Sequence, residues 1–82
     1  MALYLISYDL NKPEKDYPKL ISYLESISAH RVLYSEWFLR SSSDRDAVYN
    51  AVKSRIDDND GLLVCVVDSA IGCNLKYDIS KV

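Results

Sequence analysis

The stretch that most constrains this chain is residues 3–9, where mostly apolar and aromatic side chains lead up to Asp9. Polar residues follow at once, and an apolar run of this length beside turn-forming residues predicts a buried strand. Because side chains alternate along a strand, Leu5 and Asp9 share one expected face and Ile6 lies on the other. Both faces are largely apolar, so we expect this strand at the centre of a sheet that is covered on both sides.

The length of 82 residues predicts one domain, with a core over about residues 3–68 and a tail over residues 69–82. The hydrophobic fraction of 49% is sufficient for a core, but a core of this size is marginal, and association of copies is a common remedy. The formal net charge of −2 differs from that of domains that coat nucleic acid, which are usually basic. Any nucleic-acid contact must therefore come from a local basic patch.

The cysteines Cys65 and Cys73 and the single histidine, His30, do not have the spacing of a zinc site. Cys65 lies in an apolar run, where we expect a buried free thiol, and a disulfide to Cys73 is left open. No apolar stretch approaches the roughly 20 residues of a membrane span, and the first residues do not form a signal peptide. We therefore expect a cytoplasmic protein without a membrane partner.

Two segments have the apolar spacing of amphipathic helices. The first starts near Tyr17, with Asp16 as the expected N-cap and Pro18 in the first turn, where its missing N–H is tolerated. The second follows Ser43, which together with the aspartate three residues later resembles a capping box. Its apolar positions continue to Ile56.

The remaining segments indicate strands. Residues 30–40 form either one long strand or two short strands broken near Tyr34 and Ser35, since no Asn-Gly or Asp-Gly pair marks a tight turn. Residues 62–67 are a second apolar run, and the spacing by two in residues 75–79 allows a short edge strand in the tail. The predicted order is strand, helix, strand, strand, helix, strand.

This order predicts an α+β fold of the ferredoxin-like type, βαββαβ, with two helices on one face of an antiparallel sheet. The first and third strands are then central, and the fourth lies beside the first. The other face would be apolar and uncovered, so we expect a two-fold homodimer to bury it. The topology also brings Asp9 close to Ser35 and to the acidic turn of residues 57–60.

Three arginines are the best candidates for contacts with nucleic-acid phosphates: Arg31, Arg40 and Arg45. The fold would gather them at the end of the sheet opposite Asp9. The competing interpretation is that they are ordinary solvated or ion-paired surface side chains. The acidic residues 57–60 lack the closing Glu of a calcium loop and predict a solvated turn.

Two motifs resemble the Cas-two family: Ser-Tyr-Asp at residues 7–9 and Arg-Val-Leu-Tyr-Ser-Glu-Trp-Phe at residues 31–38. That family contains small CRISPR-associated proteins known as metal-dependent endonucleases of antiviral defence and as structural subunits of spacer integration. The virulence-associated protein D family of small ribonucleases shares the same plan. The resemblance extends over roughly residues 3–67 in the order of elements.

The resemblance implies that Asp9 binds a divalent metal ion, Mg²⁺ or Mn²⁺, opposite its counterpart across the dimer axis. It also implies catalytic roles for Asp9 and for Ser35, which would position phosphate or water, with RNA or DNA as the substrate. An integrase subunit is a further implied partner, although the tail after Val67 is shorter than the last strands that dock it in the family. The expected function is that of a metal-dependent endoribonuclease or endodeoxyribonuclease.

A rival interpretation keeps the same dimer as a non-catalytic regulatory module that binds nucleic acid or protein. Asp9 then only starts the turn after its strand, as aspartate often does, and the Ser35 hydroxyl only bonds to backbone. The neighbouring aromatic residues Trp37 and Phe38 point to opposite sides of a strand, so one belongs in the core and the other at the interface. We expect His30 at the surface.

Overall fold

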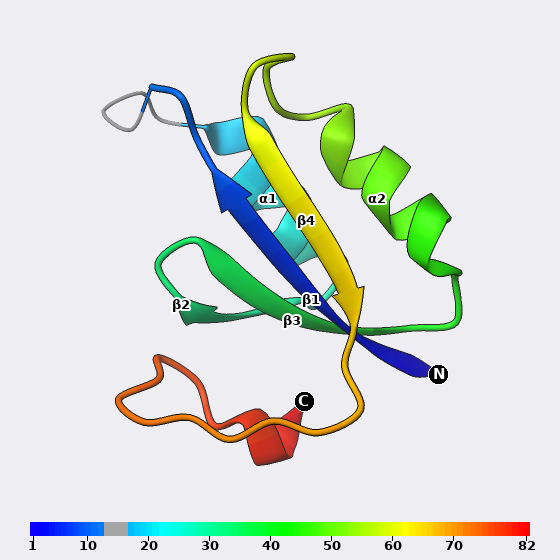
Figure 1. Ribbon diagram of the computed structural model, residues 1–82, viewed down its shortest axis with the longest axis vertical. Helices are drawn as coiled ribbons and strands as arrows, with labels where there is room; N and C mark the ends of the chain where they lie inside the picture. Colours follow the sequence, from blue (N-terminus) through cyan, green and yellow to red (C-terminus); the bar gives the residue numbers. More distant parts are fainter. Residues whose placement is uncertain (13–16) are drawn as a thin grey trace.

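The central position predicted for the first apolar run is confirmed. β1 (Ala2–Asp9) pairs antiparallel with β3 (Glu36–Ser41) on one side and with β4 (Gly61–Val66) on the other. β2 (His30–Leu33) pairs with β3, which gives the strand order β2-β3-β1-β4 (Figure 1). This α+β arrangement is compatible with the predicted ferredoxin-like plan.

Two helices and a final helical turn complete the fold in the computed structural model, which describes residues 1–12 and 17–82. α1 (Pro18–Ser26) follows β1, α2 (Arg45–Lys53) follows β3, and a 3-10 helix, η1 (Ile79–Lys81), ends the chain. Among the described residues, no helix is long and apolar enough to cross a membrane.

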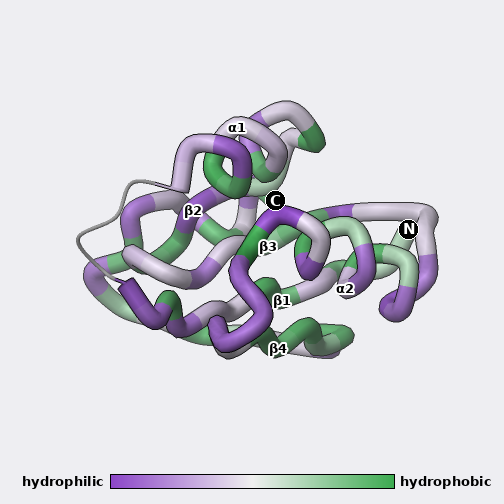
Figure 2. The backbone as a smooth tube through the Cα atoms, turned by 90° about the horizontal axis from the view of Figure 1, so that it is seen from above, coloured by the Kyte–Doolittle hydropathy of each residue, from purple (hydrophilic) through white to green (hydrophobic). Residues whose placement is uncertain are grey.

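The hydrophobic core lies between the helices and one face of the sheet. Its buried residues come from both helices and from alternate strand positions: Tyr4, Ile6, Tyr8, Leu20, Leu24, Trp37, Leu39, Val48, Val52 and Val64. Since strand side chains alternate, the strand members of this set belong to a single face, and Figure 2 shows α1 on one side of β1 and β4. The opposite face, called the open face below, carries Leu5, Ser7, Asp9, Glu36, Phe38, Leu63 and Cys65.

The ends of the helices differ by a few residues from those expected. α2 is capped by Asp44, not Ser43, because the Asp44 carboxylate accepts a hydrogen bond of 2.7 Å from the N–H of Ala47. α2 ends before Ile56, whose side chain still packs against the core. Asp16, the N-cap expected for α1, lies outside the described residues.

Residues 30–40 form two strands, because the chain turns at Tyr34 and Ser35. Trp37 lies in the core, as one of the two aromatic neighbours was expected to do. Phe38 lies on the open face but is only 8% exposed in the single chain, so it is not an open interface residue.

The tail crosses part of the open face, below the strands in Figure 1. The ring of Tyr77 stacks on that of His30, with centroids 4.1 Å apart and planes at 10°. His30 stands opposite Phe38 in the β2–β3 pair, on the open face. His30 is therefore packed against the tail, and the prediction of a surface histidine is wrong.

The tail does not form the short strand considered for residues 75–79. The N–H of Lys76 donates to the carbonyl oxygen of Val32 at 2.9 Å, which is a single bond at the edge of β2. Asp78 then caps η1 by accepting from the N–H of Ser80 at 3.0 Å, so the chain turns away before a ladder can form.

Candidate functional site

Asp9 ends β1 on the open face, where its side chain is exposed to solvent. Its carboxylate has no hydrogen bond or ion pair with any described residue. Gly61 is its partner in the β1–β4 register, and a Cβ atom placed on Gly61 would lie 3.5 Å from the Cβ of Asp9. Because Gly61 has no side chain, the space beside the Asp9 carboxylate stays open.

Ser35, one of the predicted neighbours of Asp9, lies at this end of the sheet. The carbonyl oxygen of Ser35 accepts from the N–H of Tyr8 at 3.1 Å, which places the β2–β3 turn beside the end of β1. The Ser35 hydroxyl has no hydrogen-bond partner among residues 1–12 and 17–82. The predicted backbone bond of this hydroxyl is thus absent, and the hydroxyl is left for a ligand or water.

Glu36 adds a second carboxylate that the sequence did not single out. It stands opposite Ser7, whose hydroxyl donates to its Oε2 at 3.0 Å. Asp9 follows Ser7 by two residues and is therefore a diagonal neighbour of Glu36 on the same face, at roughly 7–8 Å between Cα atoms. Alternation with Phe38 along β3 was the sequence signal that could have found Glu36.

Asp60 is buried, so the prediction that the whole acidic turn is solvated is wrong. Its carboxylate accepts from the backbone N–H of Asn11 at 2.6 Å, from that of Asp57 at 2.8 Å and from the Tyr17 hydroxyl at 3.5 Å. Burial raises the pKa of Tyr17, and the negative charges of Asp60 and Asp57 raise this pKa further. The turn ties the chain that leaves β1 to the start of α1 and so steadies the strand end that bears Asp9.

The three candidate arginines do not gather at one place. The Nη2 atom of Arg31 is 3.4 Å from the hydroxyl oxygen of Tyr8, the residue before Asp9, which is not the opposite end of the sheet. Arg40 donates from Nε to the Val82 carbonyl oxygen at 3.0 Å in the tail. Arg45 forms an exposed ion pair of 3.1 Å with its neighbour Asp46, and such pairs contribute little to stability.

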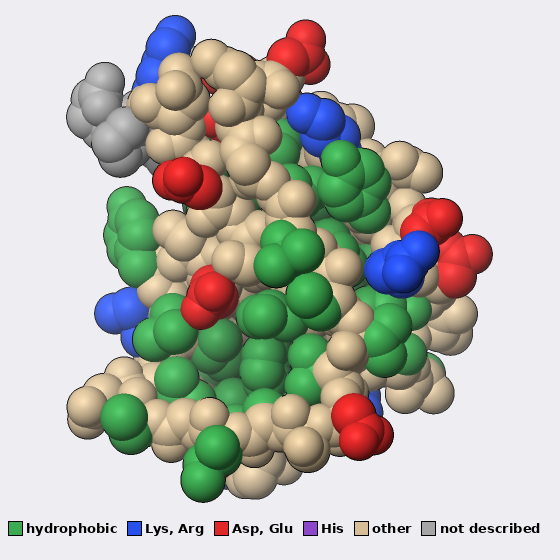
Figure 3. All heavy atoms as spheres, viewed as in Figure 1, with side chains coloured by type: hydrophobic (Ala, Val, Ile, Leu, Met, Phe, Trp, Pro, Cys, Tyr) green, Lys and Arg blue, Asp and Glu red, His purple; other side chains and the backbone are tan. Residues whose placement is uncertain are grey.

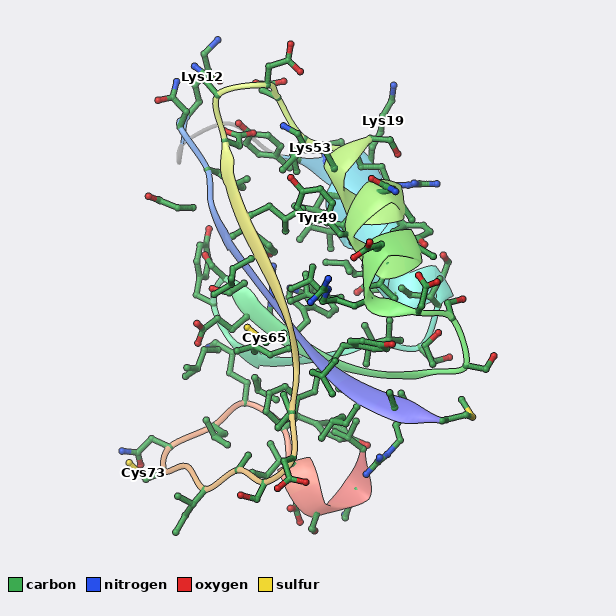
Figure 4. The ribbon with its side chains drawn as sticks, turned by 45° about the vertical axis from the view of Figure 1, so that its right-hand side comes forward. Lys12, Lys19, Tyr49, Lys53, Cys65 and Cys73 are labelled. Carbon is green, nitrogen blue, oxygen red and sulfur yellow. The ribbon has the colours of Figure 1, made fainter. Side chains whose placement is uncertain are left out.

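The part of the open face that the tail leaves uncovered is apolar. Figure 3 views this face and shows hydrophobic side chains gathered over β1 and β4 above the tail. On this face Leu63 is 57% exposed, and Leu5 is half-buried. Cys65 is half-buried here, not buried as predicted, and Cys73 is exposed in the tail well away from it; both are free thiols (Figure 4).

The donor chemistry at this end of the sheet fits a hard divalent cation, which prefers carboxylate oxygens. Within the described part of one chain, no group of three or more His, Cys, Asp or Glu side chains could hold a metal ion. One chain supplies the exposed carboxylate of Asp9 and the nearby Glu36. Two carboxylates with water are a ligand set of the kind that Mg²⁺ accepts.

Compared with models of protein families and with curated proteins, the chain shows no match.

Proposed function

We propose that the protein is a two-fold homodimer of the Cas-two type, in which the Asp9 carboxylates of both copies hold a divalent metal ion for hydrolysis of nucleic-acid phosphodiester bonds. One observation carries the proposal: the exposed carboxylate of Asp9, which has no partner among the described residues, shares the open face with exposed apolar side chains such as Leu63. The face that needs to be covered is thus the face that presents the carboxylate.

A second copy is the simplest cover for this face. Removing the exposed part of the Leu63 side chain from water would contribute roughly 1–2 kcal/mol to the free energy of association. In a two-fold interface the same patch meets itself, so its apolar side chains are buried against those of the second copy. We place the two-fold axis at the end of β1, where Asp9 faces its counterpart. The tail leaves this patch clear, because it covers the other part of the face, beside His30.

Three side chains at this end of the sheet have different roles in the proposed reaction. Asp9 supplies ligand oxygens, and Glu36, oriented by Ser7, adds a second carboxylate at the same end. When bound, a divalent ion lowers the pKa of a coordinated water and offsets negative charge on the phosphate. The hydroxyl of Ser35 lies at this end of the sheet and positions phosphate or water.

The test of catalysis is cleavage of labelled single- and double-stranded RNA and DNA with Mg²⁺, with Mn²⁺ or with EDTA. Asp9→Asn should abolish metal-dependent cleavage, because the amide removes the anionic ligand. Asp68→Asn is the matched control, since Asp68 is also exposed and lies just past the end of a strand, β4, at the other end of the sheet. Equal cleavage by wild type and Asp9→Asn would contradict the site, and no cleavage of any substrate would favour the rival binding module.

The test of assembly is the mass measured by sedimentation. Leu63→Arg should convert the dimer to a folded monomer, because it would bury unpaired charge in the interface. Tyr49→Arg adds the same charge on α2 and should leave the dimer intact (Figure 4). A wild-type monomer, or a dimer that tolerates Leu63→Arg, would overturn the proposed assembly.

A further inference from the structure

A second cluster of side chains lies on the helix side of the sheet, beside the turn between β2 and β3. It consists of Arg31, Tyr34, Trp37 and Tyr8 and is called the Arg31 cluster below. Arg31 stands opposite Trp37 in the β2–β3 pair, and Trp37 and Tyr8 both belong to the core. The Arg31 cluster is therefore separate from the open face, although Tyr8 directly precedes Asp9.

Two aromatic rings flank the guanidinium of Arg31. Its central carbon is 4.8 Å from the ring centroid of Trp37 and 5.5 Å from that of Tyr34. Cation–π attraction of this kind holds a planar guanidinium in one orientation. Arg31 is thus fixed by stacking, without a carboxylate partner among the described residues.

Most hydrogen-bond donors of Arg31 are unused. A guanidinium has five N–H donors, and within residues 1–12 and 17–82 Arg31 makes one hydrogen bond, from Nη2 to the Tyr8 hydroxyl at the long distance of 3.4 Å. That hydroxyl already accepts from Nε1 of Trp37 at 3.0 Å. Nε of Arg31 is buried and has no hydrogen-bond partner among the described residues, so the donors open to a ligand are those of the Nη atoms.

Tyr34 places a large exposed aromatic ring next to these donors. It is 71% exposed in a two-residue turn, a place where small polar residues are usual. An aromatic ring open to solvent beside a guanidinium with spare donors is the combination that binds unpaired bases and their phosphates.

We infer that the Arg31 cluster binds an unpaired nucleic-acid strand, with a base stacked on Tyr34 and an adjacent phosphate accepting hydrogen bonds from Arg31. The inference rests on the proposed function in one respect, namely that the substrate is a nucleic acid. In a duplex the bases stack on one another, so no base face is free for Tyr34, and a single strand is preferred.

The chain contains a single tryptophan, Trp37, which lies against Arg31 and provides an intrinsic signal. Titration with a short single-stranded oligonucleotide in EDTA should change the fluorescence of Trp37, and the same sequence as a duplex should bind more weakly. Tyr34→Ala should weaken single-strand binding by about five- to 100-fold, the loss expected for one stacked base. Tyr49→Ala, at the partly exposed tyrosine of α2 labelled in Figure 4, should bind like wild type.

A charge-conserving pair tests the role of the guanidinium. Arg31→Lys should weaken binding by about tenfold, because an ammonium lacks the planar set of donors. Arg45→Lys should have no effect, since Arg45 is occupied by Asp46. Folding of each variant is checked by the melting transition before titration.

Wild-type affinity in Tyr34→Ala, equal affinity for duplex and single strand, or saturation without a change in Trp37 fluorescence would each overturn the inference. These experiments test the binding inference and the proposed catalysis independently. If Asp9→Asn and wild type bind alike through Tyr34 but neither cleaves, the inference stands and the phosphodiesterase proposal falls. If cleavage requires Asp9 but binding ignores Tyr34, the inference falls and the proposed function stands.

Discussion

Adjacent residues of β1 are buried to different extents, because they lie on opposite faces of the sheet. On the helix side, Ile6 is fully buried, and the indole N–H of Trp37 donates to the Tyr8 hydroxyl at 3.0 Å. On the open face, the preceding residue, Leu5, is half-buried and Leu63 is 57% exposed. The helices thus cover one apolar face of the sheet more fully than the tail covers the other, and apolar side chains of the open face stay in contact with water.

The largest expected effect separates the two faces within β1. Ile6→Ala should lower the free energy of unfolding by about 2–5 kcal/mol, because it removes buried carbon atoms and leaves a cavity. Leu5→Ala should lower that of the monomer by only about 1 kcal/mol, since its side chain already contacts water. Urea denaturation followed by Trp37 fluorescence measures both losses. Equal losses would show that the faces are equally closed.

A smaller effect concerns the tail that partly covers the open face. Tyr77→Ser should cost about 1 kcal/mol, because it removes the stack on His30. Hydrogen exchange at the Lys76 amide, which bonds to Val32, should become faster. Ile71→Ser is the control, because Ile71 lies in the tail but is 99% exposed. Unchanged exchange in Tyr77→Ser would mean that the stack does not hold the tail.

The smallest expected effect is a dependence of stability on pH through Tyr17, which lies near the end of β1 that carries Asp9. Burial and the charges of Asp60 and Asp57 raise the pKa of Tyr17 above its ordinary value of 10.0. The folded state therefore keeps this proton where the unfolded state loses it, so the stabilisation is complete below pH 10.0 and is lost as pH rises through the folded pKa.

The matched variant is Tyr17→Phe, which cannot ionise at this position. The free energy of unfolding of wild type should fall relative to this variant as pH rises above 10.0, measured by urea denaturation at each pH. If the difference in the free energy of unfolding between wild type and Tyr17→Phe stays constant with pH, the raised pKa of Tyr17 does not contribute to stability.

Much of the fold was predictable because its signals are local. The run of residues 3–9, which is apolar on both faces, predicted a central strand, and helical spacing predicted both helices. The position of Asp9 near Ser35 followed from the order of elements and is confirmed by the bond from Tyr8 to Ser35. The exact N-cap of α2 was wrong, because Ser43 and Asp44 are adjacent and both are good caps.

The arginines show where prediction failed. The expected topology placed Arg31 with Arg40 and Arg45, at the end of the sheet where the second strand starts and the third strand ends. The register of β2 and β3 shifts after Arg31, and Trp37 and Tyr34 offer ring faces to its guanidinium. No local pattern reports such a stack, and a tyrosine within a turn was the one available hint.

The sequence by itself determined which residues share a face, because the periods of strands and helices are properties of the local backbone. Tertiary structure alone decided which face is closed, that Asp60 is buried and that the tail stacks on His30. These outcomes depend on contacts between residues far apart in the chain, such as the bond between Asn11 and Asp60. Such contacts form only when whole elements pack, so the exposed carboxylate of Asp9 and the unused donors of Arg31 become visible only in the folded chain.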